Sequence, residues 1–319
     1  MPRIQQAFVL GAGLGTRLRP LTEELPKPLV PIFQKPLITF ALDHLIDAGC
    51  ERFCVNTHHQ PQRFAESFPA NSYRDRPLLF RHEPVLLETA GGIANAGDWL
   101  GDEPFLVYNA DILSDLPLAP LLEAHARSGN IVTLALRSSA GPLHISFDRA
   151  RGKITDIRNL LGKGQPEEFV FTGIYAVQPE FLGWIERGVK RSVIPAFLKL
   201  IRQGAKLGGA ILDEGEWWDV GTRAAYMQLH RDLPTLPFPK YGAPDTTWRE
   251  RIHPAAVLGE NVELRGCSVV GAGATIGAGA VLADTIVWPR AEIASRSALT
   301  NCIVRADQKA EGTLRDTDL

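Results

Sequence analysis

The sequence predicts an α/β protein with a mostly parallel, three-layer sheet, followed by a short parallel β-helix. Two observations carry this prediction. From residue 7 to about residue 138, short apolar runs typical of buried strands alternate with amphipathic helical patterns. Residues 252–305 divide into nine successive hexads, most with an aliphatic first residue and small residues in the middle. A period of six is typical of a parallel β-helix with three faces per turn, so nine hexads make about three coils.

The alternation assigns the elements in chain order. Strands are expected at residues 7–11, 51–56, 78–82, 104–110 and 131–137. Helices are expected at residues 36–49, 61–68, 90–99 and 117–128. A strand-rich insertion at 143–178 follows, and helical patterns return near 192–203 and 222–231. Because ligands bind at the carboxyl ends of parallel strands, the functional residues are expected at that edge of the sheet.

The domain boundaries follow from the same patterns. Residues 1–232 are expected to form the main domain, and three prolines within residues 234–239 indicate a linker at 233–251. The hexads occupy 252–305, and the charged residues 306–319 are expected to be frayed. Open β-helix ends and a flat apolar face favour either a homo-oligomer formed through this tail or docking of the tail on the main domain.

Composition restricts the class of protein. The 319 residues are 45% hydrophobic and 22% charged, which is typical of a soluble core. A net charge of −2 argues against general binding to nucleic acids or membranes. No apolar stretch is long enough to span a membrane, and the chain start leaves no room for a signal peptide. The four cysteines lack metal-ligand spacing, which indicates reduced thiols and a cytoplasmic location.

The most informative segment follows the first expected strand. It reads Leu10-Gly11-Ala12-Gly13-Leu14-Gly15-Thr16-Arg17, and Pro26-Lys27-Pro28 comes ten residues later. The glycines allow backbone N–H groups to approach a bulky anion. Arg17 can donate two hydrogen bonds to phosphate oxygens, and Lys27 adds a point charge. The spacing matches neither the Rossmann dinucleotide motif nor Walker A. The glycines together with Arg17 and Lys27 suit a nucleoside triphosphate; a plain tight turn is the alternative, but it would leave Arg17 and Lys27 unexplained.

Residues Gly13 to Pro28 resemble the signature of the sugar-1-phosphate nucleotidylyltransferases, G-x-G-T-R followed by P-K-P. The resemblance extends to about residue 305. It implies a Rossmann-like nucleotidyltransferase domain and a left-handed β-helix of hexapeptide repeats. It also implies that a nucleoside triphosphate and a sugar 1-phosphate react to give an NDP-sugar and pyrophosphate. The resemblance places Arg17 and Lys27 at the reacting phosphates, and the triphosphate against Leu10, Gly11, Ala12, Gly13, Gly15 and Thr16.

Two aspartates are the candidate metal ligands. Asp111 ends an apolar run, and Asp219 lies between a pair of tryptophans and Gly221. Mg²⁺ prefers one or two carboxylates together with phosphate oxygens and water. On sequence alone each aspartate is more often a turn or cap residue, but the resemblance implies that both ligate Mg²⁺. The attacking sugar phosphate is already anionic, so no general base is required.

The base pocket is expected between residues 83 and 92. Its candidate residues are Glu83, Thr89, Ala90 and Gly91. The Glu83 carboxylate can accept hydrogen bonds from two donors of guanine or one of uracil, while a solvated loop charge is the alternative. The turn at residues 88–92 resembles that of uridylyltransferases in the family, whereas the hexad tail resembles that of guanylyltransferases. The sequence therefore favours UTP over GTP and leaves both open.

The sugar-phosphate side is expected to involve Asn109, Thr172, Gly173 and Lys163. Thr172 matches a family strand whose polar residue faces the sugar. Many relatives carry a Glu-Lys-Pro motif whose lysine contacts the sugar phosphate, and this chain lacks it. Lys163 or Arg158, in the segment 157–164, is the expected substitute.

Two other classes of protein remain open. A catalytically inactive regulatory subunit that binds an NDP-sugar would be expected to lose Arg17, Lys27, Asp111 or Asp219, and the chain retains all four. A hexapeptide-repeat acyltransferase would use the β-helix, but the hexads contain a single histidine, His253.

Overall fold

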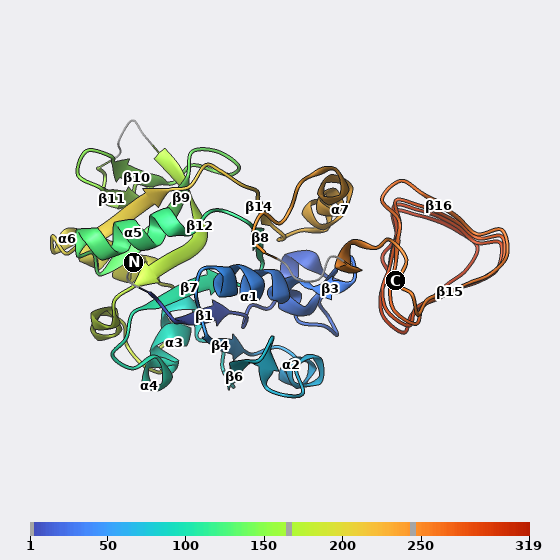
Figure 1. Cartoon of the computed structure of the whole chain (residues 1–319), viewed down its shortest axis with the longest axis horizontal. Helices are drawn as coiled ribbons and strands as arrows, with labels where there is room; N and C mark the ends of the chain where they lie inside the picture. The colour runs from blue at the N-terminus through green and yellow to red at the C-terminus, as the bar shows by residue number, and fades with distance from the viewer. Residues whose placement is uncertain (1–2, 164–167, 243–246) are drawn as a thin grey trace. The chain divides into compact units, whose positions relative to one another are not determined.

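The computed structural model describes residues 3–163, 168–242 and 247–319. The chain forms two compact units (Figure 1). The first unit contains residues 1–14, 38–219 and 239–242, and the second contains residues 15–37, 220–238 and 243–319. Residues 243–246 of the expected linker and residue 164 of the expected sugar-phosphate segment lie outside the described residues.

The first unit is built on a ten-stranded mixed sheet. From one edge to the other, its strands are β10 (Ile145–Asp148), β11 (Lys153–Ile157), β13 (Leu207–Ile211), β9 (Val132–Arg137), β12 (Glu168–Val177), β7 (Phe105–Asn109), β1 (Gln6–Leu10), β4 (Arg52–Thr57), β6 (Arg76–His82) and β5 (Ser72–Tyr73). The pairs β1–β4, β1–β7, β4–β6 and β9–β13 are parallel, whereas β12 is antiparallel to β7 and β9. The five strands expected between residues 7 and 137 are confirmed to within two residues.

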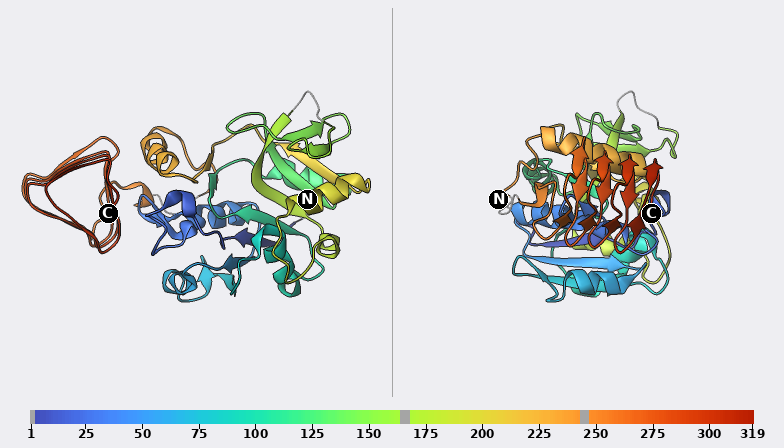
Figure 2. Two further views of the ribbon diagram at one scale, coloured as in Figure 1. Left: turned by 180° about the vertical axis from the view of Figure 1, so that it is seen from behind. Right: turned by 90° about the vertical axis from the view of Figure 1, so that its right-hand side faces the viewer.

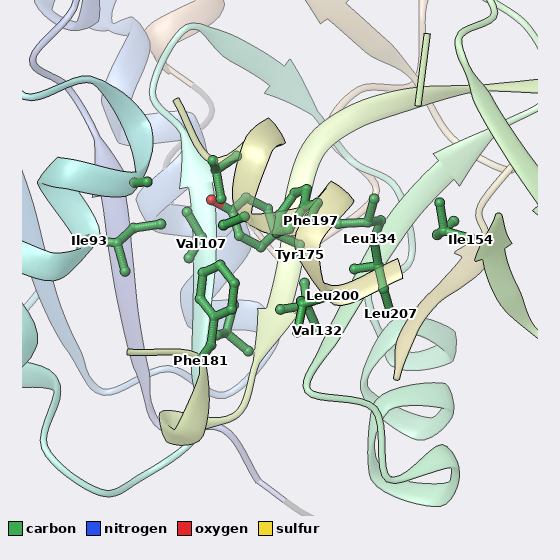
Figure 3. Packing of buried hydrophobic residues seen from close by; sticks show 14 of the residues in the cluster. Ile93, Val107, Val132, Leu134, Ile154, Tyr175, Phe181, Phe197, Leu200 and Leu207 are labelled. Carbon is green, nitrogen blue, oxygen red and sulfur yellow. The ribbon is translucent and has the colours of Figure 1, made fainter. Parts of the chain in front are cut away.

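Helices cover both faces of this sheet. They are α1 (Leu37–Asp47), α2 (Pro61–Ser67), α3 (Glu88–Asn95), α4 (Gly97–Leu100), α5 (Ala119–Ser128) and α6 (Ile194–Arg202). Alternate residues of β9 point to opposite faces. Val132 and Leu134 join a buried cluster with Phe197 of α6 (Figure 3). On the other face, the Thr133 hydroxyl makes a 2.9 Å hydrogen bond with the His125 ring of α5. The sheet is therefore the middle layer of three.

Two local features differ from the sequence prediction. The helix expected at 90–99 begins at Glu88 and is interrupted at Ala96, so that it forms α3 and α4. Strand β13 was not predicted, because Gly208 and Gly209 interrupt its short apolar run. Close packing explains a glycine here, since a Cβ on Gly209 would lie 2.6 Å from the Leu136 side chain.

The second unit ends in coils of short parallel strands (Figure 2). One sheet contains β15 (Val257–Leu258), β18 (Thr275–Ile276), β21 (Glu292–Ile293) and β24 (Lys309–Ala310). Another contains β16 (Glu263–Arg265), β19 (Val281–Ala283), β22 (Ala298–Thr300) and β25 (Thr313–Arg315). The third contains β17 (Val269–Val270), β20 (Ile286–Val287) and β23 (Ile303–Val304). In both views of Figure 2 the strands of successive coils are stacked, which fits a parallel β-helix.

The coils correct two details of the sequence prediction. Val257 pairs with Thr275, 18 residues later, but Val269 pairs with Ile286, only 17 residues later. A strict period of six is therefore not kept, because the turn between β19 and β20 is one residue shorter than the turn between β16 and β17. Residues 306–319, expected to be frayed, instead form β24 and β25 and pair with the coil before them.

One corner of the coils shows why the chain can turn there. Gly266, Asp284, Asn301 and Asp316 follow the four strands of one sheet in turn, and all four have a positive φ. Glycine, asparagine and aspartate adopt this left-handed conformation most readily. Each corner residue of this sheet is therefore of a type that adopts the left-handed conformation readily.

The second unit also contains α7 (Arg223–Asp232), which packs against the coils. The Trp288 indole donates a 3.0 Å hydrogen bond to the Tyr226 hydroxyl, which in turn donates to the Pro31 carbonyl at 2.7 Å. Pro31 lies in the hairpin of β2 (Pro31–Ile32) and β3 (Lys35–Pro36). Within the described ranges, the helices all lack the length and apolar character required to cross a membrane.

Candidate active site

The glycine-rich turn is anchored at its base and open at its tip. The Gly11 amide donates a 2.8 Å hydrogen bond to the Asn56 side chain. A Cβ on Gly11 would lie 2.8 Å from the Asn56 carbonyl oxygen, so glycine is required there. Gly13, by contrast, is exposed, and a Cβ there would meet no atom within 4 Å. The backbone around Gly13 is thus open to solvent, and the binding of an anion there stays a prediction.

Glu83 has a different environment from the one expected. Its side chain is completely buried, and Oε1 accepts a 2.8 Å hydrogen bond from the Asn56 amide. Its Oε2 accepts a 2.9 Å hydrogen bond from the backbone amide of Leu87. Both carboxylate oxygens therefore have partners inside the protein. This geometry corrects the expectation that Glu83 presents its carboxylate to the base, and instead makes it a support for the turn at Leu87.

The neighbouring turn at the start of α3 is fixed on the segment 189–193. The Thr89 hydroxyl accepts a 2.7 Å hydrogen bond from the Val193 amide, and the Ala90 amide donates to the Arg191 carbonyl at 2.9 Å. Gly91 faces the Val189 carbonyl so closely that a Cβ would clash with it. These expected nucleotide-binding residues therefore lie in a turn that is held by hydrogen bonds and close packing. The turn follows Glu88, which is exposed and has a positive φ of 60°.

Asp111 and Asp219 are brought to neighbouring strands. Asp111 immediately precedes β8 (Ile112–Ser114), which pairs antiparallel with β14 (Trp217–Asp219). In that register Asp219 lies opposite Ile112, the residue that directly follows Asp111. Asp111 is half-buried and Asp219 is exposed.

The two-stranded ribbon of β8 and β14 is stabilised by a third aspartate, Asp115, which is buried. The carboxylate of Asp115 accepts hydrogen bonds from the amides of Glu216, at 2.6 Å, and Lys240, at 2.8 Å. Two carboxylates at a strand end are the donor set that Mg²⁺ shares with phosphate oxygens and water, so Asp111 and Asp219 fit that ion. Over the described ranges, His, Cys, Asp and Glu side chains form no metal-binding group of three or more.

The sugar-phosphate candidates fall into two groups. Gly173 has a positive φ of 81° and lies against the side chain of Asn109, whose Nδ2 would be 2.7 Å from a Cβ at Gly173. The hydroxyl of Thr172 is completely buried and donates a 2.9 Å hydrogen bond to the Ala135 carbonyl. Thr172 therefore stabilises the irregular middle of β12, and the expectation that its hydroxyl faces the sugar is corrected.

Lys163 lies away from these residues. The Asp156 carboxylate accepts hydrogen bonds from the amides of Leu161 and Lys163, at 3.0 and 2.9 Å, and folds the loop back on itself. Lys163 then lines a hollow together with Leu207, the first residue of β13. That is the edge opposite to the carboxyl ends of the parallel strands, so the structure does not support Lys163 as the substitute for the family lysine.

The second unit carries the remaining candidates. Gly15, with a positive φ of 62°, precedes the short 3-10 helix Thr16–Leu18, and Arg17 within that helix is exposed. Lys27 begins another 3-10 helix, Lys27–Leu29, and is buried. The Thr22 hydroxyl donates a 2.8 Å hydrogen bond to the Gly15 carbonyl and fixes the start of this segment.

Asn56, which connects Gly11 to Glu83, was not predicted from the sequence. The available signal was its position, since it is a polar residue near the carboxyl end of the buried strand β4. A cavity of about 570 Å³ also lies in the first unit, beside Asp115 and Tyr241, and is lined by none of the predicted site residues.

Comparison with known proteins identifies the class. A family model described as nucleotidyl transferase matches residues 6–235. The chain therefore belongs to the nucleotidyl transferase family.

Its relatives have more particular names. A mannose-1-phosphate guanylyltransferase of Mycobacterium tuberculosis is 31% identical over 88% of this chain and 79% of its own length. An N-acetylmuramate alpha-1-phosphate uridylyltransferase of Neisseria meningitidis is 32% identical over 68% of this chain and 93% of its own length. A UTP–glucose-1-phosphate uridylyltransferase of Synechocystis is 25% identical over 94% of this chain and 82% of its own length.

Proposed function

We propose that this protein is a Mg²⁺-dependent sugar-1-phosphate nucleotidylyltransferase. The observation that carries the proposal is the pairing of β8 with β14, which makes Asp111 and Asp219 neighbours. The relatives from Mycobacterium, Neisseria and Synechocystis support the substrate class, since each is named for a sugar 1-phosphate. The accessible backbone at Gly13 supports the binding of a triphosphate beside β1.

In the proposed reaction, a phosphate oxygen of the sugar 1-phosphate forms a bond to the α-phosphorus of the nucleoside triphosphate. The bond between the α-phosphorus and the bridging oxygen breaks, and pyrophosphate leaves with its electron pair. Bound Mg²⁺ would neutralise phosphate charge during this transfer. Asp111 and Asp219 would hold the ion, and the backbone around Gly13 would bind the triphosphate.

Arg17 and Lys27 are proposed to stabilise the charge of the departing pyrophosphate. Arg17 suits this role because its exposed guanidinium can donate two parallel hydrogen bonds to phosphate oxygens. Asn109 is the proposed contact on the sugar-phosphate side, where Gly173 leaves room for its side chain. No residue has to remove a proton from the nucleophile, because a phosphate monoester is already anionic at neutral pH.

For the nucleotide we propose UTP, with GTP as the alternative. The turn at residues 88–92 and the Neisseria relative support UTP, whereas the Mycobacterium relative supports GTP. We further propose that the coils at residues 252–319 form a left-handed β-helix of hexapeptide type and that the enzyme is cytoplasmic. All four cysteines are free thiols, which supports a reducing compartment.

Pyrophosphate release tests the proposal. The purified protein is incubated with Mg²⁺ and each combination of UTP, GTP, dTTP, CTP or ATP with a panel of sugar 1-phosphates. We expect release that depends on both substrates and on Mg²⁺, together with an NDP-sugar detected by mass spectrometry. Absence of release with every combination would contradict the function. Release that needs no sugar 1-phosphate would indicate a hydrolase instead.

A further inference from the structure

Arg305 joins the coils of the second unit to the segment that carries Arg17. It follows β23, and its side chain is only 15% exposed. Its Nε donates a 2.8 Å hydrogen bond to the Leu319 carbonyl oxygen. Its Nη1 donates to the Pro20 carbonyl oxygen at 3.1 Å and lies 3.5 Å from the Glu23 carboxylate. One guanidinium therefore connects the coils to the chain just after the glycine-rich turn.

The guanidinium is held in a fixed orientation. The backbone amide of Arg305 donates to the same Leu319 carbonyl at 2.9 Å, so one oxygen fixes both the backbone and the side chain of Arg305. Because the guanidinium is planar, fixing one side of it also fixes the direction of the N–H groups on the other side. Pro20 is therefore bound by a donor that is already oriented.

The segment around Pro20 is a series of tight turns. Backbone hydrogen bonds run from Leu18 to Gly15, from Leu21 to Leu18 and from Glu23 to Pro20. Leu18 and Leu21 are buried, while Arg17 is exposed. The carbonyl that Arg305 binds is part of this series, three residues after Arg17. Fixing that carbonyl limits how far the turn that presents Arg17 can move.

We propose that Arg305 is a positioning residue for nucleotidyl transfer, which acts by fixing the turn that presents Arg17. This inference rests on the proposed function, in which Arg17 stabilises charge on the phosphates. The coils then contribute to the reaction as well as to the structure. A small displacement of a charged group during phosphoryl transfer is costly, because catalysis depends mainly on position and electrostatics.

Kinetics of Arg305→Ala test the inference. We expect kcat to fall by about 10- to 100-fold, with KM for the nucleotide changed less than about threefold. Arg305→Lys should recover part of kcat, since an ammonium can donate to Pro20 without orienting on Leu319. The matched control is Arg290→Ala, which removes an equal charge from an exposed ion pair with Asp307 on the same coils. Arg290→Ala should retain wild-type kcat.

A double variant distinguishes a positioning role of Arg305 from a general structural defect. If Arg305 acts through Arg17, adding Arg305→Ala to Arg17→Ala should change kcat by less than about twofold. A purely structural defect would reduce kcat by the same factor in both backgrounds. Multiplicative losses in the double variant would therefore overturn the inference, as would an Arg305→Ala enzyme with the kcat of Arg290→Ala.

Limited proteolysis gives a readout that does not need activity. Trypsin cleaves after Arg17, and the bond after Arg19 resists because Pro20 follows. Under native conditions we expect Arg305→Ala to accelerate cleavage after Arg17 by about fivefold or more, and Arg290→Ala to leave it unchanged. Unaltered cleavage in Arg305→Ala would overturn the anchor, and faster cleavage without a loss of kcat would overturn the positioning role. If wild-type protein transfers no nucleotide at all, the proposed function fails and the positioning role fails with it, while cleavage still reports whether Arg305 holds the turn.

Discussion

The amide of Asn56 donates a 2.8 Å hydrogen bond to the carboxylate of Glu83, and both side chains are buried. The other end of the same amide accepts a hydrogen bond from Gly11 at 2.8 Å. This short chain of contacts connects the glycine-rich turn after β1 to the turn at Leu87, where the Glu83 carboxylate binds a second amide. Two segments expected to bind nucleotide are thus fixed to each other through the core.

Glu83→Gln tests whether this carboxylate supports the turns. A glutamine has one oxygen and one NH₂, so one of the two donors that Glu83 now binds would face another donor. We expect the free energy of unfolding to fall by about 1–3 kcal/mol, because a buried donor loses its partner. kcat/KM should fall by a similar factor with UTP and with GTP. Both are measured by urea unfolding and steady-state kinetics.

The control for this prediction is Glu88→Gln, because Glu88 is exposed and close in sequence. It should unfold like the wild type. A change in the ratio of kcat/KM between UTP and GTP in Glu83→Gln would show that Glu83 reads the base after all.

Gly11 and Gly13 provide a matched pair of substitutions. Gly11→Ala would place a Cβ 2.8 Å from the Asn56 carbonyl, so we expect the free energy of unfolding to fall by about 1–3 kcal/mol. Gly13→Ala meets no neighbouring atom and should unfold at the wild-type temperature. If a triphosphate lies against Gly13, its alanine variant should still raise KM for the nucleotide. Thermal melting and KM are the measurements, and equal melting of the two variants would contradict the packing argument.

The sequence located most of the central strands and helices and the glycine-rich turn, because these depend on local patterns. Residues 131–137, for example, alternate apolar and small residues, and β9 is found at Val132–Arg137. What the sequence could not show was the environment of individual polar side chains. Glu83 and Thr172 read as residues available to a ligand, but both are buried with partners far along the chain.

The environment of Lys163 was likewise not predictable from the sequence. Its position in the sequence is close to that of the missing family lysine, yet the Asp156 carboxylate turns the loop toward the opposite edge of the sheet. The adjacency of Asp111 and Asp219 arises from the β8–β14 pairing, which connects segments far apart in the chain. Only the resemblance to a family predicted that pair.

Asp111→Asn and Asp219→Asn test the proposed Mg²⁺ site. Each substitution removes a carboxylate that we propose binds Mg²⁺, and nearly preserves the side-chain volume. We expect activity at saturating substrate to fall by about 100-fold or more, while the melting temperature changes by less than about 2 °C. Asp102→Asn, at an exposed position, is the control and should keep wild-type activity. Either variant with near-wild-type turnover at saturating Mg²⁺ would remove that residue from the metal site.

The stability of the fold should depend on pH through His44. Burial lowers the pKa of His44 to about 4, from its ordinary value of 6.5. Its Nε2 donates to the Leu116 carbonyl at 2.7 Å, so Nδ1 accepts from the Tyr108 hydroxyl at 3.1 Å, and the neutral ring satisfies both contacts. Above pH 6.5 the ring is neutral in both the folded and unfolded chains, and no stability is lost.

Between pH 6.5 and about 4 only the unfolded chain binds the proton at His44, so acid favours unfolding. At pH 5 the loss should be about 2 kcal/mol for this one histidine. His44→Gln keeps a donor for Leu116 and does not titrate, so its free energy of unfolding should fall less steeply from pH 7 to pH 5 than that of the wild type. Urea unfolding at several pH values measures the difference, with exposed His82→Gln as the control. Parallel curves for wild type and His44→Gln would show that His44 does not cause the acid sensitivity.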